Sequence, residues 1–288
     1  MWIENNLMKS LLLILTVAML LGALSLAAQE PPRGASSTPP PATGRRPPQA
    51  RTQPEFKDYN AAYALSGGPA AEKAANDFAE KYPTSELRAY LYSKAMHEYQ
   101  TENNPGKMLA MGEKVLTLDA DNAVALVLTA TVLSDNLSDS DQDRTAKVTE
   151  IKKNATRALD TADTSFTPGP GNTAEQIAAY KTTLRSMAHS ALGIMYLKTG
   201  DNVAAEKELR VAADLNKAQP DAYNWYHLAL AQDHQEKYQE ALASVDRALQ
   251  YAASNPDLGK LAAGERERLV KLTTASPGPS PSPTPPRQ

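Results

Sequence analysis

The sequence predicts an all-α fold built from repeated pairs of antiparallel helices. Only 6% of the 288 residues are aromatic, whereas alanine and leucine abound, and small or unbranched side chains lose little rotamer freedom in a helix. Apolar residues recur with a period of 36 residues in the C-terminal half. Fourteen of the 21 prolines lie near the two ends of the chain, which places the folded part between them.

The N-terminal segment has the pattern of a secretory signal. Lys9 precedes an uninterrupted apolar run that begins at Leu11 and ends in small residues. We therefore predict a signal peptide over residues 1–28, with translation starting at Met1 or Met8. The protein is then expected to be periplasmic or secreted. The alternative is an uncleaved inner-membrane anchor over residues 11–28, because this run is at the short edge of what spans a bilayer.

Two proline-rich segments flank the expected fold. Residues 29–55 contain eight prolines and residues 275–288 contain six, and both lack the apolar residues that would offset the entropy of ordering. We expect both segments to be disordered. Helical repeats, about four to five in number, are expected over residues 56–256, interrupted by a polar insert at 134–145. A helix over residues 257–274, polar on one side, suits the capping of an exposed apolar end.

Charge limits the choice of partner. The stretch from Glu55 to Ala275 contains 24 basic and 31 acidic residues, a net charge of −7, which repels phosphate backbones. Nucleic acid is therefore not an expected partner. The first tail is basic, with Arg33, Arg45 and Arg46, and suits either a position near an anionic membrane surface or a solvated linker. The chain has no cysteine, which excludes disulfides and thiolate metal sites.

The repeat is clearest when residues 189–222 are aligned with residues 225–258. The matched positions, each 36 residues apart, are Leu192 with Leu228, Ala205 with Ala241, Ala212 with Ala248, and Pro220 with Pro256. The repeat pattern is W-x2-L-G-x2-Y, then A-x3-F and a helix-ending proline. The residues that fit it are His189, Leu192, Gly193, Tyr196, Ala205, Leu209 and Pro220. The sequence therefore resembles the tetratricopeptide repeat family, extracytoplasmic bacterial type, over roughly residues 59–256.

The resemblance implies a right-handed superhelical solenoid of antiparallel helix pairs. In this family the first helix of each pair, the A helix, lines a concave groove that holds a segment of a partner protein. The family's groove positions fall on Tyr90, Ser93, His97, Gln100 and Thr101 in one copy, and on Tyr223, Tyr226, Leu230, Asp233 and His234 in the last copy. The resemblance implies a non-enzymatic scaffold or adaptor of the bacterial cell envelope that binds a protein.

A second reading is a structural or oligomerising solenoid without a peptide ligand. It applies if the chain's own long helix, expected from Asn172 to Thr199, fills the groove. In either reading, small residues let the paired helices approach closely, and the expected ones are Gly193, Ala205, Ala212, Ala229, Ala241 and Ala248.

The polar insert carries a partial calcium-loop pattern. Asp139, Asp141, Asp143 and Glu150 fall at positions 1, 3, 5 and 12 of such a loop. Position 6, however, is Arg144 instead of the glycine that permits the sharp turn. The alternative is an acidic, solvated loop whose aspartates cap the next helix.

The histidines do not predict a metal or catalytic site. His227 and His234 are seven residues apart, so their side chains lie about 10 Å apart along a helix, too far to share one ion. His189 occupies the repeat position of Trp225 and is expected to pack. No G-x-S-x-G, Walker or H-E-x-x-H motif occurs. We therefore expect no enzymatic activity and no cofactor.

Overall fold

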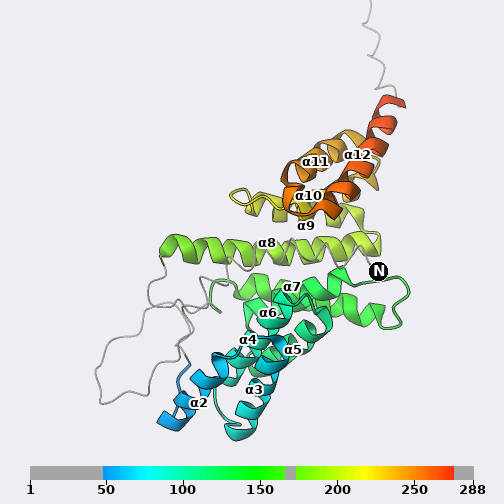
Figure 1. Ribbon diagram of the computed structural model, residues 1–288. Coiled ribbons are helices and arrows are strands. Elements are labelled where there is room, and N and C mark those ends of the chain that lie inside the picture. The colour runs from blue at the N-terminus through cyan, green and yellow to red at the C-terminus, as the bar shows by residue number, and fades with distance from the viewer. Residues whose placement is uncertain (1–47, 166–172, 276–288) are drawn as a thin grey trace, which may run out of the picture.

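The computed structural model describes residues 48–165 and 173–275. In this part of the chain the fold is all-α, with eleven α-helices packed as sequential antiparallel pairs and no strands (Figure 1). The helices are α2 (Gln53–Tyr63), α3 (Gly68–Lys81), α4 (Arg88–Thr101), α5 (Pro105–Leu118), α6 (Ala123–Asp135), α7 (Arg144–Thr161), α8 (Ala174–Thr199), α9 (Asn202–Leu215), α10 (Ala222–Asp233), α11 (Tyr238–Tyr251) and α12 (Pro256–Ala275). The all-α prediction is confirmed.

The helix ends follow from local capping chemistry. Asn122 caps α6 because its side chain accepts a hydrogen bond from the backbone N–H of Ala125. Thr173 and Gln176 form a reciprocal capping box at the start of α8. The same helix ends at Gly200, whose φ of 85° is the left-handed conformation that glycine adopts without a steric cost. These residues fix where each pair turns.

Small residues sit where paired helices touch, as the repeat predicts. Ala205, Ala212, Ala229, Ala241 and Ala248 are all fully buried. On α8, a Cβ added at Gly193 would lie 2.5 Å from Cγ of Leu209 on α9, which is closer than side chains tolerate. The expectation that small residues permit close approach of the helices is therefore confirmed at Gly193, where a larger side chain has no space.

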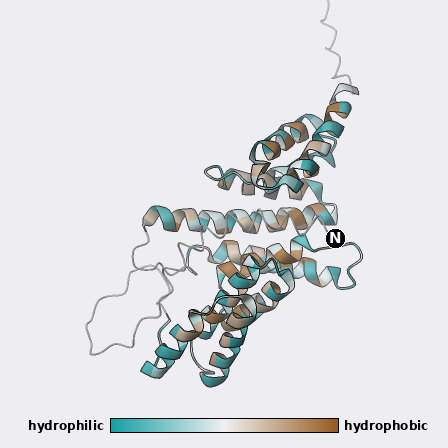
Figure 2. Cartoon of the chain, viewed as in Figure 1, coloured by the Kyte–Doolittle hydropathy of each residue, from teal (hydrophilic) through white to brown (hydrophobic). Residues whose placement is uncertain are grey.

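The long helix α8 lies between two groups of helices. It packs against α6 and α7 on one side and against α9 and α10 on the other (Figure 1). The neighbouring helix α6 is mostly apolar without a polar face, and all of its residues except Val124 are buried. Elsewhere, hydrophobic and hydrophilic residues are interspersed along each helix, as expected for helices with one buried side (Figure 2). Helix α6 and the C-terminal half of α8 thus lie in the core of the described chain.

The terminal segments fall largely outside the described residues. The predicted signal or anchor over 1–28 lies there, as do most of the 29–55 linker and all but the first residue of the 275–288 tail. The end of the linker is helical instead of disordered, because α2 begins at Gln53. Among the residues that are described, no helix has the length and apolar character that a membrane crossing requires. The polar insert is shorter than expected, because α6 continues to Asp135 and α7 begins at Arg144.

Candidate functional site

The groove positions predicted on α4 lie at different depths. Tyr90, Ser93 and His97 are half-buried, and Thr101 is exposed. Gln100 is only 2% exposed, and its Oε1 lies 3.2 Å from Nδ1 of His97. Gln100 therefore packs inside the fold and is left out of the candidate surface. The positions that keep surface for a partner are Tyr90, Ser93, His97 and Thr101.

The structure also places Tyr223 of the last repeat inside the fold. Its side chain is 3% exposed, and its hydroxyl donates a hydrogen bond of 2.6 Å to Oδ1 of Asp135 at the end of α6. The sequence pattern assigned Tyr223 to the groove by its register on α10, but this hydrogen bond to α6 and the packing of α10 on α8 and α9 bury it. Tyr223 therefore joins α6 to α10, and it is not available to a partner.

Helix α12 covers another predicted groove position. Arg268 of α12 forms an ion pair with Asp233, whose side chain is only 10% exposed, and Arg268 also pairs with Glu265 at 2.8 Å. These two carboxylates raise the pKa of Arg268. His234 remains exposed, with Nδ1 3.3 Å from Oδ1 of Asn202. At this end of the chain, His234 is thus open to solvent and Asp233 is enclosed.

The remaining predicted groove positions of α10 are packed against neighbouring side chains. Tyr226 and Leu230 are half-buried, and the ring of Tyr226 stands at 84° to the ring of His227 with 5.5 Å between their centroids. His227 is 8% exposed, and its Nδ1 lies 2.9 Å from the carbonyl oxygen of Tyr223. Burial lowers the pKa of His227 to about 4, so this imidazole is neutral at physiological pH.

A buried carboxylate lies beside this junction. Asp221 is 5% exposed and caps α10, since its Oδ1 accepts a hydrogen bond of 3.0 Å from the backbone N–H of Tyr223. Burial raises the pKa of Asp221 to about 6, and the nearby charge of Asp135 adds to this effect. Sequence reasoning missed this cluster because its members come from two helices far apart in the chain.

The polar insert is held by the chain's own cations. Arg144 pairs with Asp139 at 2.9 Å, and Lys147 lies 3.1 Å from both Asp141 and Asp143. The guanidinium of Arg144 also donates a hydrogen bond of 2.6 Å to the carbonyl of Lys198 near the end of α8. The expected capping of the next helix by an aspartate is wrong, because Asp143 at the N-cap of α7 makes no capping hydrogen bond with its side chain. The aspartates instead form ion pairs, with the Arg144 cation on the first Asp of the calcium pattern.

No metal site emerges from the described residues. In residues 48–165 and 173–275, no group of three or more His, Asp or Glu side chains could hold an ion, and the four calcium-pattern residues, Glu150 included, are no exception. His189 is half-buried against Glu208, with 2.6 Å between Nδ1 and Oε2, which supplies the single partner expected for a packing histidine.

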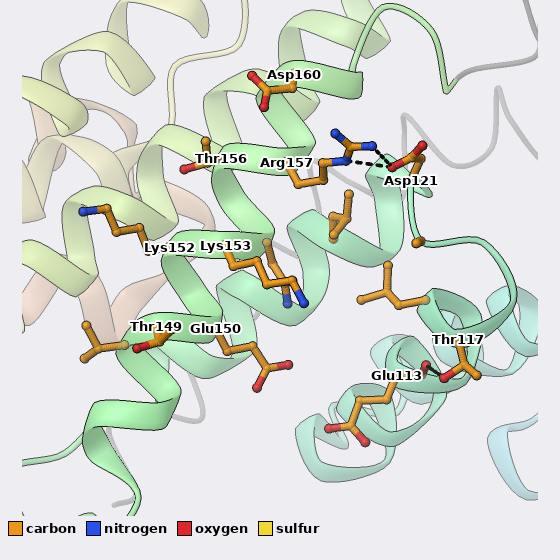
Figure 3. Close-up of a pocket in the computed structure, with 15 residues that line it drawn as sticks. Glu113, Thr117, Asp121, Thr149, Glu150, Lys152, Lys153, Thr156, Arg157 and Asp160 are labelled. Atoms are coloured by element: carbon orange, nitrogen blue, oxygen red, sulfur yellow. Dashed lines mark hydrogen bonds and ion pairs between the residues drawn. The ribbon is translucent and has the colours of Figure 1, made fainter.

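An open hollow of about 920 Å³ lies between α5 and α7 (Figure 3). Leu116 of α5, Leu126 of α6 and Val148 of α7 give it an apolar part. Its remaining lining is mostly charged or hydroxyl-bearing, and Lys153 extends from α7 toward the middle of the hollow. The volume falls in the range of sites that bind small molecules or peptide side chains. Sequence reasoning missed it, because no motif marks a place where two helices diverge.

Comparison with known proteins gives no further assignment. No family model matches the chain, and no curated protein shows significant sequence similarity to it.

Proposed function

We propose that this chain is a non-enzymatic protein-binding scaffold of the tetratricopeptide repeat type, built as a right-handed superhelical solenoid. The observation that carries the proposal is the stack of antiparallel helix pairs whose contacts are made by small residues at the repeat positions, from Gly193 and Ala205 to Ala248. Stacked pairs of this kind bury one continuous core and leave an extended surface for a partner.

We propose that the partner segment binds along α4. Tyr90, Ser93, His97 and Thr101 offer an aromatic ring, an imidazole and hydroxyl groups on a helix held rigidly by its neighbours. Tyrosine contributes a large amphipathic contact area at a low cost in conformational entropy. Such a surface suits an extended or helical polypeptide bound through apolar contact and hydrogen bonds.

We further propose that the protein acts in the bacterial cell envelope, either in the periplasm or anchored at the inner membrane. The signal pattern in residues 1–28 and the basic, proline-rich segment after it support this location. A spacer of that composition would let the helical part reach partners at some distance from the membrane.

A structural solenoid without a peptide ligand is the second candidate, and one observation favours it. Helix α8 packs along α6. Three α6 residues that follow the groove positions Ser93, His97 and Gln100 by 34 residues are buried, and they are Val127, Thr131 and Ser134. The chain's own helices thus occupy the middle of the expected groove. In this alternative the exposed surface of α4 would serve contacts between copies of the chain.

In-cell photo-crosslinking followed by mass spectrometry tests the proposal. The full chain and a Tyr90→Ala, His97→Ala variant would be compared, with Tyr238→Ala as a control, because Tyr238 is a half-buried tyrosine on α11. We expect one partner protein to be captured by the wild type and the control and lost from the α4 variant. Equal capture by all three would count against α4. Capture of further copies of the chain, with a dimer in sedimentation analysis, would favour the second candidate.

A further inference from the structure

The chain enters the described structure beside the start of α4. Ala50 is 3% exposed and belongs to the main hydrophobic core. The next residue, Arg51, donates a hydrogen bond of 2.9 Å from its guanidinium to the hydroxyl of Thr84, in the connection that precedes α4. The segment before residue 48 therefore begins next to the α4 surface. This surface consists of Tyr90, Ser93, His97 and Thr101.

Tyrosine rings from two helices border the N-terminal end of the α4 surface. Tyr59 of α2 is buried, and burial raises its pKa, an effect to which the nearby phenols of Tyr63 and Tyr90 add. The ring centroids of Tyr59 and Tyr63 lie 5.6 Å apart. Tyr63 and Tyr90 are both half-buried, so each keeps exposed surface. Proline-rich polypeptides pack against exposed aromatic rings of this kind.

The charged side chains of α4 have partners within the fold. Lys94 forms an ion pair with Glu98, and the two side chains are only 17% and 18% exposed. Glu98 also accepts a hydrogen bond of 2.6 Å from the backbone N–H of Gly67. Arg88, the remaining charged residue of α4, is half-buried and donates a hydrogen bond to the carbonyl of Ser85. A ligand of the α4 surface therefore gains from ring packing and hydrogen bonds more than from ion pairs.

The segment before residue 48 has a composition that fits this surface. Residues 29–47 contain six prolines, three arginines and one glutamate, a net charge of +2, opposite in sign to the −7 of the region from Glu55 to Ala275. Proline-rich sequences favour the polyproline II conformation, which has no internal hydrogen bonds and presents its carbonyls to donors. At about 3.1 Å per residue, roughly seven such residues span the 14-residue helix α4, which is about 21 Å long.

We propose that residues 29–47 bind along the α4 surface of their own chain and compete there with the partner segment. This inference rests on the α4 surface of the proposed function and adds its regulation. The proline rings pack against Tyr63, Tyr90 and His97. The hydroxyl of Ser93 donates a hydrogen bond to a backbone carbonyl of the segment. A ligand tethered beside its site acts at an effective concentration on the order of 1 mM, so contacts that are weak in a separate peptide suffice for occupancy.

Site-specific photo-crosslinking of the purified full chain tests this proposal. A photoreactive phenylalanine analogue would be incorporated in place of Tyr90. In a parallel preparation it would replace Tyr238, a half-buried tyrosine of α11 at the other end of the helix stack (Figure 1). Isotope-labelled and unlabelled chains would be mixed, so that mass spectrometry separates crosslinks within one copy from crosslinks between copies. We expect position 90 to crosslink to residues 29–47 of the same copy, and position 238 not to do so.

Two proline variants, matched in number and type of substitution, show whether the proline-rich segment is the ligand. The first variant carries Pro39→Ser, Pro40→Ser, Pro41→Ser and Pro47→Ser. The control carries Pro281→Ser, Pro283→Ser, Pro285→Ser and Pro286→Ser in the C-terminal tail. Each would be checked for native helicity by circular dichroism. We expect the crosslink from position 90 to fall at least about threefold in the first variant and to stay unchanged in the control.

In cells, the first variant should capture at least about threefold more partner at the α4 surface than the wild type does, because the competing segment is weakened. Unchanged capture would overturn the competition. Crosslinks from position 90 to residues 276–288, to another copy or to no segment would overturn the proposal, and so would equal yields from the two proline variants. Capture of a partner in cells would then still support the proposed function. Crosslinking within one copy without any captured partner would instead place the segment on α4 and count against the proposed function.

Discussion

The hydroxyl of Tyr223 donates a hydrogen bond of 2.6 Å to Oδ1 of Asp135 and thereby joins α10 to the end of α6 across 88 positions of the sequence. Both residues are buried, Tyr223 at 3% and Asp135 at 9% exposed. A carboxylate in such a position needs its hydrogen-bond donors, because removing one leaves buried charge without compensation. The contact therefore stabilises the packing of the C-terminal helices on the N-terminal ones.

Tyr223→Phe should destabilise the protein by about 1–3 kcal/mol, since the substitution removes only the hydroxyl and leaves Asp135 buried. Urea unfolding followed by circular dichroism gives the change in midpoint. Tyr226→Phe is the matched control, because Tyr226 is half-buried on the same helix. Equal midpoints for the two variants would show that the hydrogen bond contributes nothing.

The buried groups Asp221 and His227 should have opposite effects on stability between about pH 4 and pH 6. Folding raises the pKa of Asp221 from 3.8 to about 6, so its contribution is fully present below pH 3.8 and is lost as the pH rises through 6. Folding lowers the pKa of His227 from 6.5 to about 4, so its contribution is present above pH 6.5 and is lost as the pH falls through 4. In the wild type these two dependences nearly cancel.

Single substitutions should expose each dependence. Between pH 5 and pH 6, Asp221→Asn should become more stable as the pH rises, by roughly 1 kcal/mol per pH unit, because only His227 then titrates. His227→Asn should become less stable over the same interval by a similar amount. Urea midpoints at several pH values measure both slopes. If the stability of both variants changed with pH in the same direction, the pKa shifts assigned to Asp221 and His227 would be wrong.

Gly193→Ala should destabilise the protein by about 1–3 kcal/mol, because the new methyl group would lie 2.5 Å from Cγ of Leu209. Gly264→Ala is the matched control on α12, where an added Cβ meets no atom within 4 Å. There the better helix propensity of alanine should raise stability by about 0.5–1 kcal/mol. Thermal unfolding of both variants tests the contrast, and a Gly193→Ala protein as stable as the control variant would rule out tight packing here.

Arg144→Gln should lower stability by about 1–2 kcal/mol, because it weakens the hydrogen bond of Arg144 to the carbonyl of Lys198 and its ion pair with Asp139. Asp139→Asn should have little effect, since that side chain is 94% exposed. Millimolar calcium should leave the melting temperature of the wild type unchanged. A rise in melting temperature with calcium would instead support the hypothesis that the insert binds calcium.

The amino-acid sequence by itself determined the helical character of the chain and the repeat positions where helices touch. Alanine and leucine content, capping residues such as Asn122 and Thr173, and small residues such as Gly193 act locally or between consecutive helices. Their effects can therefore be predicted from spacing along the chain.

Only the tertiary structure decided which side of each helix is covered. Register placed both Tyr90 and Tyr223 on the groove side, yet Tyr90 is half-buried, whereas Tyr223 is buried and hydrogen-bonded to Asp135 of α6. The hollow beside Lys153 likewise depends on how far α5 and α7 diverge. Periodicity defines the faces of a helix, but what covers a face depends on packing between helices that are distant in sequence, and no local pattern encodes it.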